Sequence, residues 1–342
     1  MFKTAIASLT LVALGTCAQA EALTVVSVGG INKKSQQEAF YTPFEKQHSV
    51  VVRAAQYNGE IGMIKAQVDT RSVTWDVVEV DHAQLQRGCE EGLFERLPAI
   101  PGVRKEDFVE DGVSECGVGI FIWSTALVYD PKAVSKAPKE WAELWDLESF
   151  PGKRALRKGA KLTLEIALMA DGVPRDQVYQ VLRQPGGVDR AFRKLDQIKT
   201  QIQWWESGAQ PMQWLAAGDV SMTSVYITRA ISAQKEGYDF PLVWNGSLYD
   251  MDSWAIVKGS RNQEAALKFI AFASLPQQQK IFAEKMFNGP THKQTMELIA
   301  PETRNSFPTS EQNMAQALKV DSGFWIDHGT ELEERFNAWA AR

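Results

Sequence analysis

Short apolar runs alternate with amphipathic segments along the first third of the chain. Runs of β-branched residues predict buried strands, and apolar residues at helical spacing predict the helices that cover them. Ala39, Phe40 and Phe44, for example, fall on one face of a predicted helix. The predicted order is strand, helix, strand, helix, strand and helix, at Leu23–Val28, Ser35–Gln47, Val50–Ala55, Ile61–Val68, Trp75–Val80 and His82–Gly92. This alternation predicts an α/β fold with a doubly wound lobe.

A second α/β unit is predicted in the middle of the chain, over roughly residues 130–248. Two long apolar segments flank it, Gly119–Tyr129 and Leu248–Val257. A chain that leaves one lobe through the first segment and returns through the second forms two discontinuous lobes joined by two hinge strands. The expected division is lobe 1, residues 21–125 plus 252–342, and lobe 2, residues 126–251. Such lobes enclose a cleft, in which ligands bind at the carboxyl ends of strands.

Residues 1–20 have the pattern of a secretory signal peptide. Lys3 is their only charged residue, an apolar run follows at Ala5–Leu14, and Ala18-Gln19-Ala20 forms a small-x-small cleavage site. The apolar run is too short for a permanent transmembrane helix. Cys17 leaves a lipoprotein alternative open, although the residue before it fits that motif poorly. We expect a cleaved signal and a mature, soluble protein in the bacterial periplasm.

Length and charge narrow the class of protein. Removal of residues 1–20 leaves about 320 of the 342 residues, more than one core normally holds, so two domains are expected. It also removes one lysine, which leaves 36 Lys and Arg against 42 Asp and Glu, a formal net charge of −6. A mildly acidic chain with dispersed charge lacks the basic surface of a nucleic-acid-binding protein. Eleven tryptophans supply flat side chains that suit ligand contacts.

Two cysteines remain after processing, Cys89 and Cys116. In an oxidising compartment such a pair predicts a disulfide, with two buried thiols as the alternative. Zinc is not indicated, because the chain has no CxxC or HxxH motif and only four histidines. The glycine pair at residues 29–30 lacks the further glycine of a dinucleotide fingerprint. We therefore expect no cofactor.

Four motifs carry a resemblance to a known family. They are Trp75-Asp76-Val77-Val78, Leu215-Ala216-Ala217-Gly218-Asp219-Val220, Asp250-Met251-Asp252-Ser253-Trp254-Ala255-Ile256 and Ala265–Leu275. In this order after a signal peptide, they resemble the extracellular solute-binding proteins of bacterial ABC importers, in the polyamine-binding branch. The resemblance implies a two-lobed periplasmic-binding-protein fold of type II that closes over a small molecule. It also implies a partner, an ABC permease with ATPase subunits at the inner membrane. We expect a monomer and no enzymatic activity.

Two departures from the polyamine binders concern charge. Polyamine binders carry an aromatic residue two positions before the acid that binds ammonium, where this chain has Asp250 before Asp252. They also place carboxylates after a Gly-Lys turn in lobe 2. Here the residues that follow this turn are basic, although each alone is typical of a solvated surface: Arg157, Lys158 and Lys161. A diamine would be repelled where it needs its second carboxylate. The exchange favours a zwitterionic ligand.

Asp252 is the residue that the resemblance assigns to the ligand's ammonium group, through a charge-assisted hydrogen bond. A cap or a hinge salt bridge is the alternative. Arg229, just beyond the predicted strand Val220–Val225, can bind a carboxylate through its bidentate guanidinium group, unless it is an ordinary exposed helix residue. Tyr226 and Tyr249 are candidates for closing over the ligand's alkyl chain, with ordinary packing as the alternative.

Further candidates follow from their position in extended segments and at strand ends. Trp205 is expected to line the site, because it and the tryptophan before it point to opposite sides of an extended segment. Asp250, Asp81 and His82 fall at the ends of predicted strands, where Asp81 is equally a helix N-cap and His82 an ordinary surface residue. Gly30 lets backbone N–H groups approach a ligand, or it forms a plain turn.

These residues predict a periplasmic receptor for a small amine-containing solute, with ammonium at Asp252 and carboxylate at Arg229. A linear ω-amino acid such as 4-aminobutyrate fits both groups, and a polyamine such as putrescine or spermidine is the alternative. An aminophosphonate gains from the basic turn, whereas a ferric-ion binder would need adjacent tyrosines that the sequence lacks. An exported hydrolase is the rival class, but no G-x-S-x-G motif is present.

Overall fold

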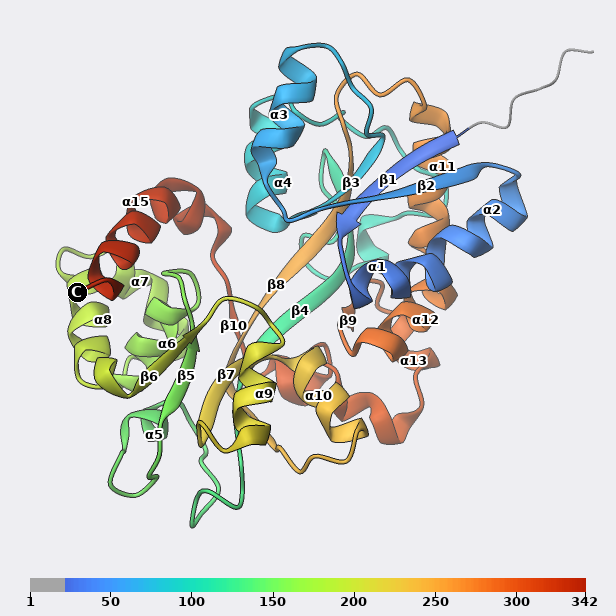
Figure 1. Ribbon diagram of the computed structural model, residues 1–342. Helices are drawn as coiled ribbons and strands as arrows, with labels where there is room; N and C mark the ends of the chain where they lie inside the picture. The colour runs from blue at the N-terminus through green and yellow to red at the C-terminus, as the bar shows by residue number, and fades with distance from the viewer. Residues whose placement is uncertain (1–21) are drawn as a thin grey trace, which may run out of the picture.

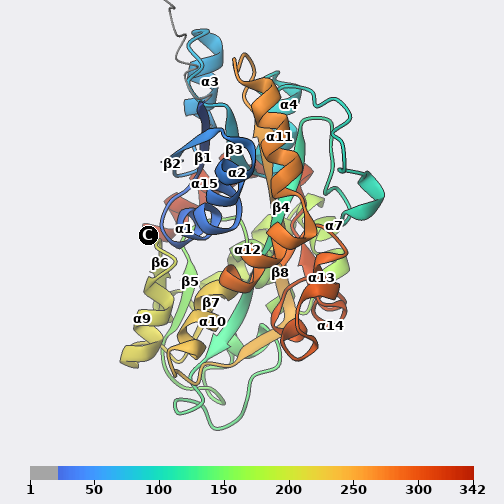
Figure 2. The same cartoon turned by 90° about the vertical axis from the view of Figure 1, so that its right-hand side faces the viewer.

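The structure is a computed structural model that describes residues 22–342 (Figure 1). The predicted signal peptide, residues 1–20, lies outside the described residues. Two α/β halves lie on either side of a pair of long strands, and the side view keeps the same arrangement (Figure 2). No helix within residues 22–342 combines the length and the apolar character needed to cross a membrane.

Ten strands of the described chain form one curled sheet, in the order β2-β1-β3-β8-β4-β7-β5-β6. The longest, β4 (Gly117–Tyr129) and β8 (Leu242–Ile256), pair antiparallel and run through both halves of the sheet. Two short strands join them, β9 (Gly289–Pro290) beside β4 and β10 (Leu318–Lys319) beside β8. The others are β1 Ala22–Val28, β2 Val51–Tyr57, β3 Val77–Asp81, β5 Arg154–Arg157, β6 Ile202–Trp205 and β7 Met222–Tyr226.

Helices pack against both faces of the sheet (Figures 1 and 2). A π-helical stretch, Gln37–Tyr41, joins the first two into one continuous helical segment. The helices are α1 Ile31–Gln36, α2 Thr42–His48, α3 Ile61–Asp69, α4 His82–Glu90, α5 Ala142–Trp145, α6 Thr163–Ala170, α7 Val178–Arg183, α8 Gly187–Asp196, α9 Gln210–Ala217, α10 Ile227–Lys235, α11 Gln263–Ala273, α12 Pro276–Met286, α13 Thr295–Leu298, α14 Glu311–Met314 and α15 Ser322–Ala340.

Lobe 1 is the half that contains β1, β2 and β3, with β1 parallel to both of its neighbours. Successive side chains of a strand point to opposite faces, so each apolar strand serves two layers of core. Val25 packs in one core with Phe44 of α2 and Phe269 of α11, whereas Val26 packs on the other face with Ile64 of α3. The predicted α/β fold, with two discontinuous lobes joined by two hinge strands, is confirmed, and the hinge strands are β4 and β8.

Lobe 2, which contains β5, β6 and β7, differs from the prediction at the C-terminus. Residues 252–342 were all expected in lobe 1, but the apolar face of α15 packs into the lobe 2 core, while the helix also contacts α4 of lobe 1. The ring of Phe336 lies 5.3 Å from that of Trp204, and Trp325 Nε1 donates to Glu165 Oε1 at 2.8 Å. The apolar face of this helix indicates that it is buried, yet nothing in its sequence says which half it covers.

The predicted disulfide is present and lies within lobe 1. It joins Cys89, in the last turn of α4, to Cys116, directly before β4. The covalent bond therefore ties the helix that follows β3 to the first hinge strand. A cross-link of this kind stabilises the fold mainly by restricting the unfolded chain.

Replacement of both cysteines by serine (C89S together with C116S) is expected to lower the free energy of unfolding by about 3 kcal/mol. This is the magnitude expected for a disulfide that closes a loop between cysteines with a sequence separation of 27. The measurement is denaturant unfolding of a protein comprising residues 21–342, which contains no further cysteine. The wild type under reducing conditions should show the same loss. An unchanged unfolding midpoint would contradict the expectation.

Candidate functional site

A cavity of about 420 Å³ lies between the lobes, where β4 and β8 pass from one to the other. Lobe 1 contributes the carboxyl ends of β1, β2 and β3 and the start of α1. Lobe 2 contributes the end of β7 and the first turn of α10. The polar and aromatic side chains of the lining that concern the site are Asn32, Tyr57, Glu79, Asp81, Trp123, Tyr226, Thr228, Arg229 and Asp252.

Three carboxyl groups form the acidic side of the cavity, those of Glu79, Asp81 and Asp252. The antiparallel register pairs Asp252 of β8 with Asp81 of β3, and Glu79 lies on the same face of β3 two residues earlier. Burial raises the pKa of Glu79. Burial and the charges of Glu79 and Asp81 raise the pKa of Asp252 well above its ordinary value. A site of this kind favours a bound cation.

Trp123 of β4 connects the acidic side to lobe 2. Its indole Nε1 donates to Oδ1 of Asp252 at 3.1 Å, and its ring meets Tyr226 edge-on at a centroid distance of 5.9 Å. Tyr226 in turn meets Trp205 edge-on at 5.7 Å. This row of rings crosses from the hinge to β7 and β6. It gives the cavity a rigid aromatic wall that suits methylene groups and cations.

Arg229 supplies a positive charge on the lobe 2 side of the cavity. It lies in the first turn of α10, which begins directly after β7, and its side chain is exposed. Within residues 22–342 it has no hydrogen-bonding or ion-pair partner. The side chain of the N-cap residue Tyr226 makes no hydrogen bond to the first turn of α10. A free guanidinium group beside a helix N-terminus is well placed for a carboxylate.

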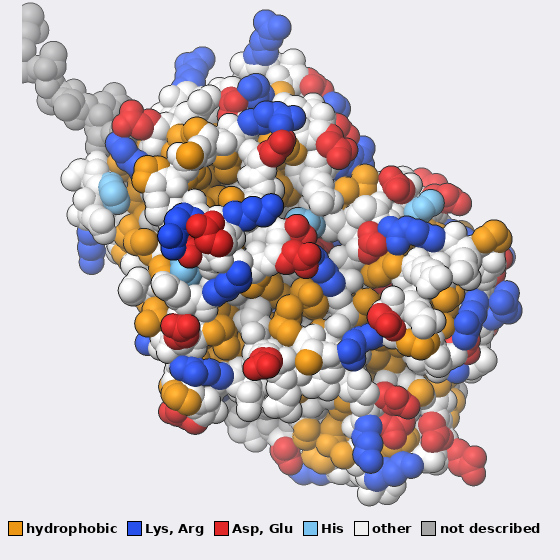
Figure 3. All heavy atoms as spheres, turned by 180° about the vertical axis from the view of Figure 1, so that it is seen from behind, with side chains coloured by type: hydrophobic (Ala, Val, Ile, Leu, Met, Phe, Trp, Pro, Cys, Tyr) orange, Lys and Arg blue, Asp and Glu red, His pale blue; other side chains and the backbone are white. Residues whose placement is uncertain are grey.

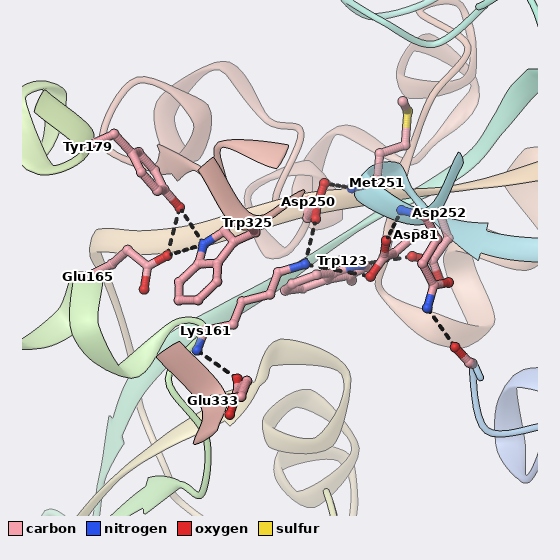
Figure 4. Close-up of polar contacts among 12 residues, drawn as sticks. Asp81, Trp123, Lys161, Glu165, Tyr179, Asp250, Met251, Asp252, Trp325 and Glu333 are labelled. Carbon is pink, nitrogen blue, oxygen red and sulfur yellow. Dashed lines mark hydrogen bonds and ion pairs between the residues drawn. The ribbon is translucent and has the colours of Figure 1, made fainter. Parts of the chain in front are cut away.

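Lys161, in the loop before α6, connects lobe 2 to lobe 1 and the hinge (Figure 4). Its Nζ lies 3.3 Å from Oδ2 of Asp250 and 3.6 Å from Oδ2 of Asp81. Burial opposes its charge, but the two carboxylates raise the pKa of Lys161 above its ordinary value. The carboxylate of Glu333 in α15 accepts the backbone N–H groups of Ala160 at 3.0 Å and Lys161 at 3.1 Å. This contact fixes the loop that carries the lysine.

Four of the predicted site residues line the cavity: Asp252, Arg229, Tyr226 and Asp81. Asp81 is also the N-cap of α4, because its Oδ1 accepts the backbone N–H of Gln84 at 2.8 Å. The two readings of Asp81 from the sequence are therefore compatible, since one oxygen caps the helix while the other faces Lys161.

Asp250 and Trp205 were predicted in the site but lie behind its lining. Asp250 is buried, with its Oδ2 bound to Lys161 and its Oδ1 accepting the backbone N–H of Met251 at 2.8 Å. Trp205 is buried in the lobe 2 core behind Tyr226. The prediction that Trp205 faces the cleft was wrong, because the adjacent tryptophans point to two core layers rather than to core and cleft.

Tyr249, His82 and Gly30 also lie outside the lining. Tyr249 is in the part of β8 that pairs with Lys319 of β10. His82 is buried in α4, with its Nε2 4.0 Å from Oδ2 of Asp111. Gly30 adopts a positive φ of 71° before α1, and its neighbour in the glycine pair borders the cavity in its place.

Sequence reasoning missed several residues of the site. Glu79 interrupts the β-branched run of β3, and a carboxylate in such a run is a usable signal of a buried functional group. Trp123 and Asn32 gave no comparable signal, because an aromatic in a buried strand and an amide near a helix start are common. Lys161 was one of three basic residues, and the sequence did not tell which of them turns inward.

Charged side chains elsewhere are mixed in sign. Figure 3 shows lysines and arginines interspersed with acidic residues over the face opposite to that of Figure 1. Positive and negative side chains alternate on this face without a broad basic area (Figure 3). No group of three or more His, Cys, Asp or Glu side chains in the described chain is arranged to hold a metal ion.

The chain belongs to the bacterial extracellular solute-binding proteins, whose family model matches residues 39–303. It is 53% identical to the gamma-aminobutyric acid-binding protein of Pseudomonas aeruginosa PAO1, over 95% of this chain and 92% of that relative. The solved structure of a GABA receptor matches with a TM-score of 0.86 and 32% identity, over 94% of this chain and 98% of that one. The two-lobed periplasmic-binding-protein fold is thereby confirmed.

The resemblance to polyamine binders is confirmed at lower identity. The spermidine/putrescine-binding periplasmic protein of Escherichia coli K12 is 26% identical to this chain, over 56% of this chain and 55% of its own length. The relatives therefore include proteins named for both ligand classes that the sequence analysis considered.

Replacement of Lys161 by methionine is expected to lower the free energy of unfolding by about 3 kcal/mol at neutral pH, because it leaves the buried Asp250 without its cation. Burial already raises the pKa of Asp250, and loss of Lys161, whose charge lowers it, raises it further. The folded variant then holds a proton that the unfolded chain releases. The loss of stability should accordingly be smaller near about pH 5 than near about pH 7.

Lys158→Met is the matched control for this measurement by denaturant unfolding. Lys158 lies three residues earlier and forms an exposed ion pair with Glu206 at 2.6 Å. Loss of such a pair costs at most about 1 kcal/mol. Equal free energies of unfolding for the two variants at neutral pH would show that Lys161 does not neutralise the buried carboxylate of Asp250.

Proposed function

We propose that the protein is the periplasmic receptor of a bacterial ABC importer and that its ligand is a linear ω-amino acid, with 4-aminobutyrate as the leading candidate. The observation that carries this proposal is the separation of charge across one cavity. Asp252 and Glu79 lie on the acidic side, and the unpaired Arg229 lies on the lobe 2 side. The relatives named for gamma-aminobutyric acid support the same ligand.

In the proposed complex the ammonium group of the ligand donates to Asp252. Its carboxylate accepts from Arg229 and from the N–H groups of the first turn of α10. The rings of Trp123 and Tyr226 stand between these ends and contact the methylene groups. An α-amino acid carries its two charges on one carbon, so it cannot satisfy both sides of the cavity at once. A chain of methylene groups between the charges is what the arrangement favours.

A polyamine is the second candidate, because the cavity has several carboxyl groups and the family includes polyamine binders. One ammonium group of a polyamine would bind at Asp252 in the same way as the ammonium group of an amino acid. The second ammonium group of the polyamine would approach Arg229, whose positive charge opposes it. The proposal therefore ranks diamines below ω-amino acids of similar length.

We further infer a receptor rather than a catalyst. Ligand bound to both sides of the cavity links the two lobes and so stabilises the arrangement in which they are close together. A permease complex at the inner membrane would recognise this arrangement. The proposal also includes export by the predicted signal peptide, residence in the periplasm and a monomeric state.

The test is isothermal titration calorimetry with four ligands: 4-aminobutyrate, butylamine, butyrate and putrescine. Butylamine lacks the carboxylate and butyrate lacks the ammonium group, so each should bind at least about 30-fold more weakly than 4-aminobutyrate. Putrescine should bind more weakly as well. Tighter binding of putrescine than of 4-aminobutyrate would overturn the ω-amino acid assignment in favour of the polyamine one.

Arg229→Met is expected to weaken binding of 4-aminobutyrate by at least about 30-fold, because the ligand carboxylate loses its charged partner. Putrescine should bind this variant better than it binds the wild type, since the repulsion is gone. Arg53→Met, at an exposed position of β2 away from the cavity, is the control and should bind like the wild type. Unchanged affinity of Arg229→Met for 4-aminobutyrate would contradict the proposed carboxylate site.

A further inference from the structure

Glu79 is a buried carboxyl group without a cationic partner. Within residues 22–342 no lysine, arginine or histidine forms an ion pair with Glu79 or with Asp252, whereas Lys161 lies between Asp81 and Asp250. The carboxyl groups of Glu79 and Asp252 border the same cavity. Two carboxyl groups that lie together without a cation cannot both ionise at low cost, so we expect the ligand-free pair to hold one proton.

Neutral donors fix the position of Glu79. Asn32 Nδ2 donates to both of its oxygens at 3.0 and 2.9 Å, and Gln36 Nε2 donates to Oε2 at 2.6 Å. The hydroxyl group of Tyr41 donates to Oε1 of Gln36 at 2.6 Å, which sets the orientation of that amide. These contacts hold Glu79 as an acceptor in a fixed place without neutralising it.

Asn32 provides a second, independent sign of a missing ligand. Its side chain is 8% exposed and borders the cavity, and its Oδ1 is buried without a hydrogen-bond donor in the described chain. Leaving such an acceptor unpaired is costly. An ammonium group has three N–H donors, and the acceptors gathered here are Asn32 Oδ1, Asp252 and Glu79.

We propose that Glu79 is the second carboxylate of the ammonium site, and that the proton it shares with Asp252 is displaced to solvent when the ammonium group of the ligand binds. This inference rests on the proposed function, because it requires a ligand with an ammonium group. The balance is simple: a cation enters, one proton leaves for the buffer, and no covalent bond of the ligand changes. The site exchanges one positive charge for another.

The surroundings do not offer a competing proton in the cavity. The titratable and charged groups that face the pair or its neighbours are Asp81, Asp250, Lys161, Arg229, Tyr57, Tyr41, Glu60 and His82. Lys161 forms ion pairs with both Asp81 and Asp250, and burial raises the pKa of both Tyr57 and Tyr41 above the ordinary value. His82 lies on α4 towards Asp111, outside the lining.

The consequence is a pH dependence with a definite sign. Burial raises the pKa values of the pair in the free protein, and a bound ammonium group lowers them, because it favours the ionised form. Binding therefore releases up to one proton per ligand while the free pair is protonated, and affinity rises by up to tenfold per pH unit over that range. The amine and carboxyl groups of an ω-amino acid keep their charges between about pH 5 and about pH 9.

The experiment is calorimetric titration of the wild type with 4-aminobutyrate, in buffers of different ionisation enthalpy, at several values between about pH 5 and about pH 9. We expect proton release, and affinity that increases with pH and then levels off. In Glu79→Gln the pair no longer shares a proton, so proton release should fall and affinity should be weaker and less dependent on pH. Glu165→Gln is the matched control, because Glu165 is equally buried but lies outside the cavity.

The outcomes separate this inference from the proposed function. Tight binding to the wild type without proton release, and with constant affinity, overturns the inference and leaves the function standing. If the Glu79→Gln variant releases as many protons per ligand as the wild type, the inference is also overturned. If the wild type binds no ω-amino acid at any pH, the proposed function fails and the inference fails with it. The wild-type titration gives the decision even if a variant does not fold.

Discussion

The burial of negative charge on the second hinge strand is the constraint on which the site depends. Asp250 and Asp252 lie two residues apart on β8 and face the same side of the sheet. Asp250 is buried and Asp252 is half-buried, and a carboxylate in such surroundings needs a cation, donors or a proton. Asp250 has Lys161 as its cation. Asp252 accepts one indole N–H from Trp123 and forms no ion pair within residues 22–342, so it is the group that still lacks a cation.

The two aspartates therefore differ in role: Asp250 belongs to an ion pair of the hinge, whereas Asp252 remains available to a ligand. The ion pair of Lys161 holds lobe 2 to the hinge and to Asp81 of lobe 1 without any ligand. The cavity beside it retains unmatched charges of both signs, on Asp252 and on Arg229. A zwitterionic ligand, as proposed, would pair with both and would span the lobes. Binding energy and lobe contact therefore come from the same set of charges.

The sequence predicted the fold well, because strand and helix periodicity are local properties and the order of elements limits the topology. It also led to Asp252, which lies within one of the family motifs, and to Arg229, which follows a recognisable strand. The packing of α15 and the direction of Trp205 could not be predicted. Both depend on which of two buried surfaces an apolar side chain meets, and this is decided by contacts between residues far apart in the chain. Asn32 and Gln36 were missed for a similar reason, because their amides acquire a role only once Glu79 lies beside them.

The two departures from the polyamine-binding pattern are explained together by one contact. The sequence shows an acid, Asp250, where polyamine binders have an aromatic residue, and basic residues where they have carboxylates. In the structure Asp250 and one of those basic residues, Lys161, are the two ends of a single ion pair. Either change alone would leave a buried charge unmatched, whereas the two together are compensated. Glu333 of α15 supports this pair by holding the backbone of the lysine loop, so the C-terminal helix contributes to the hinge from the opposite end of the chain. The exchange of acid for base thus first satisfies the hinge, and the proposed preference for a zwitterion rests instead on Arg229, with which no side chain of residues 22–342 pairs.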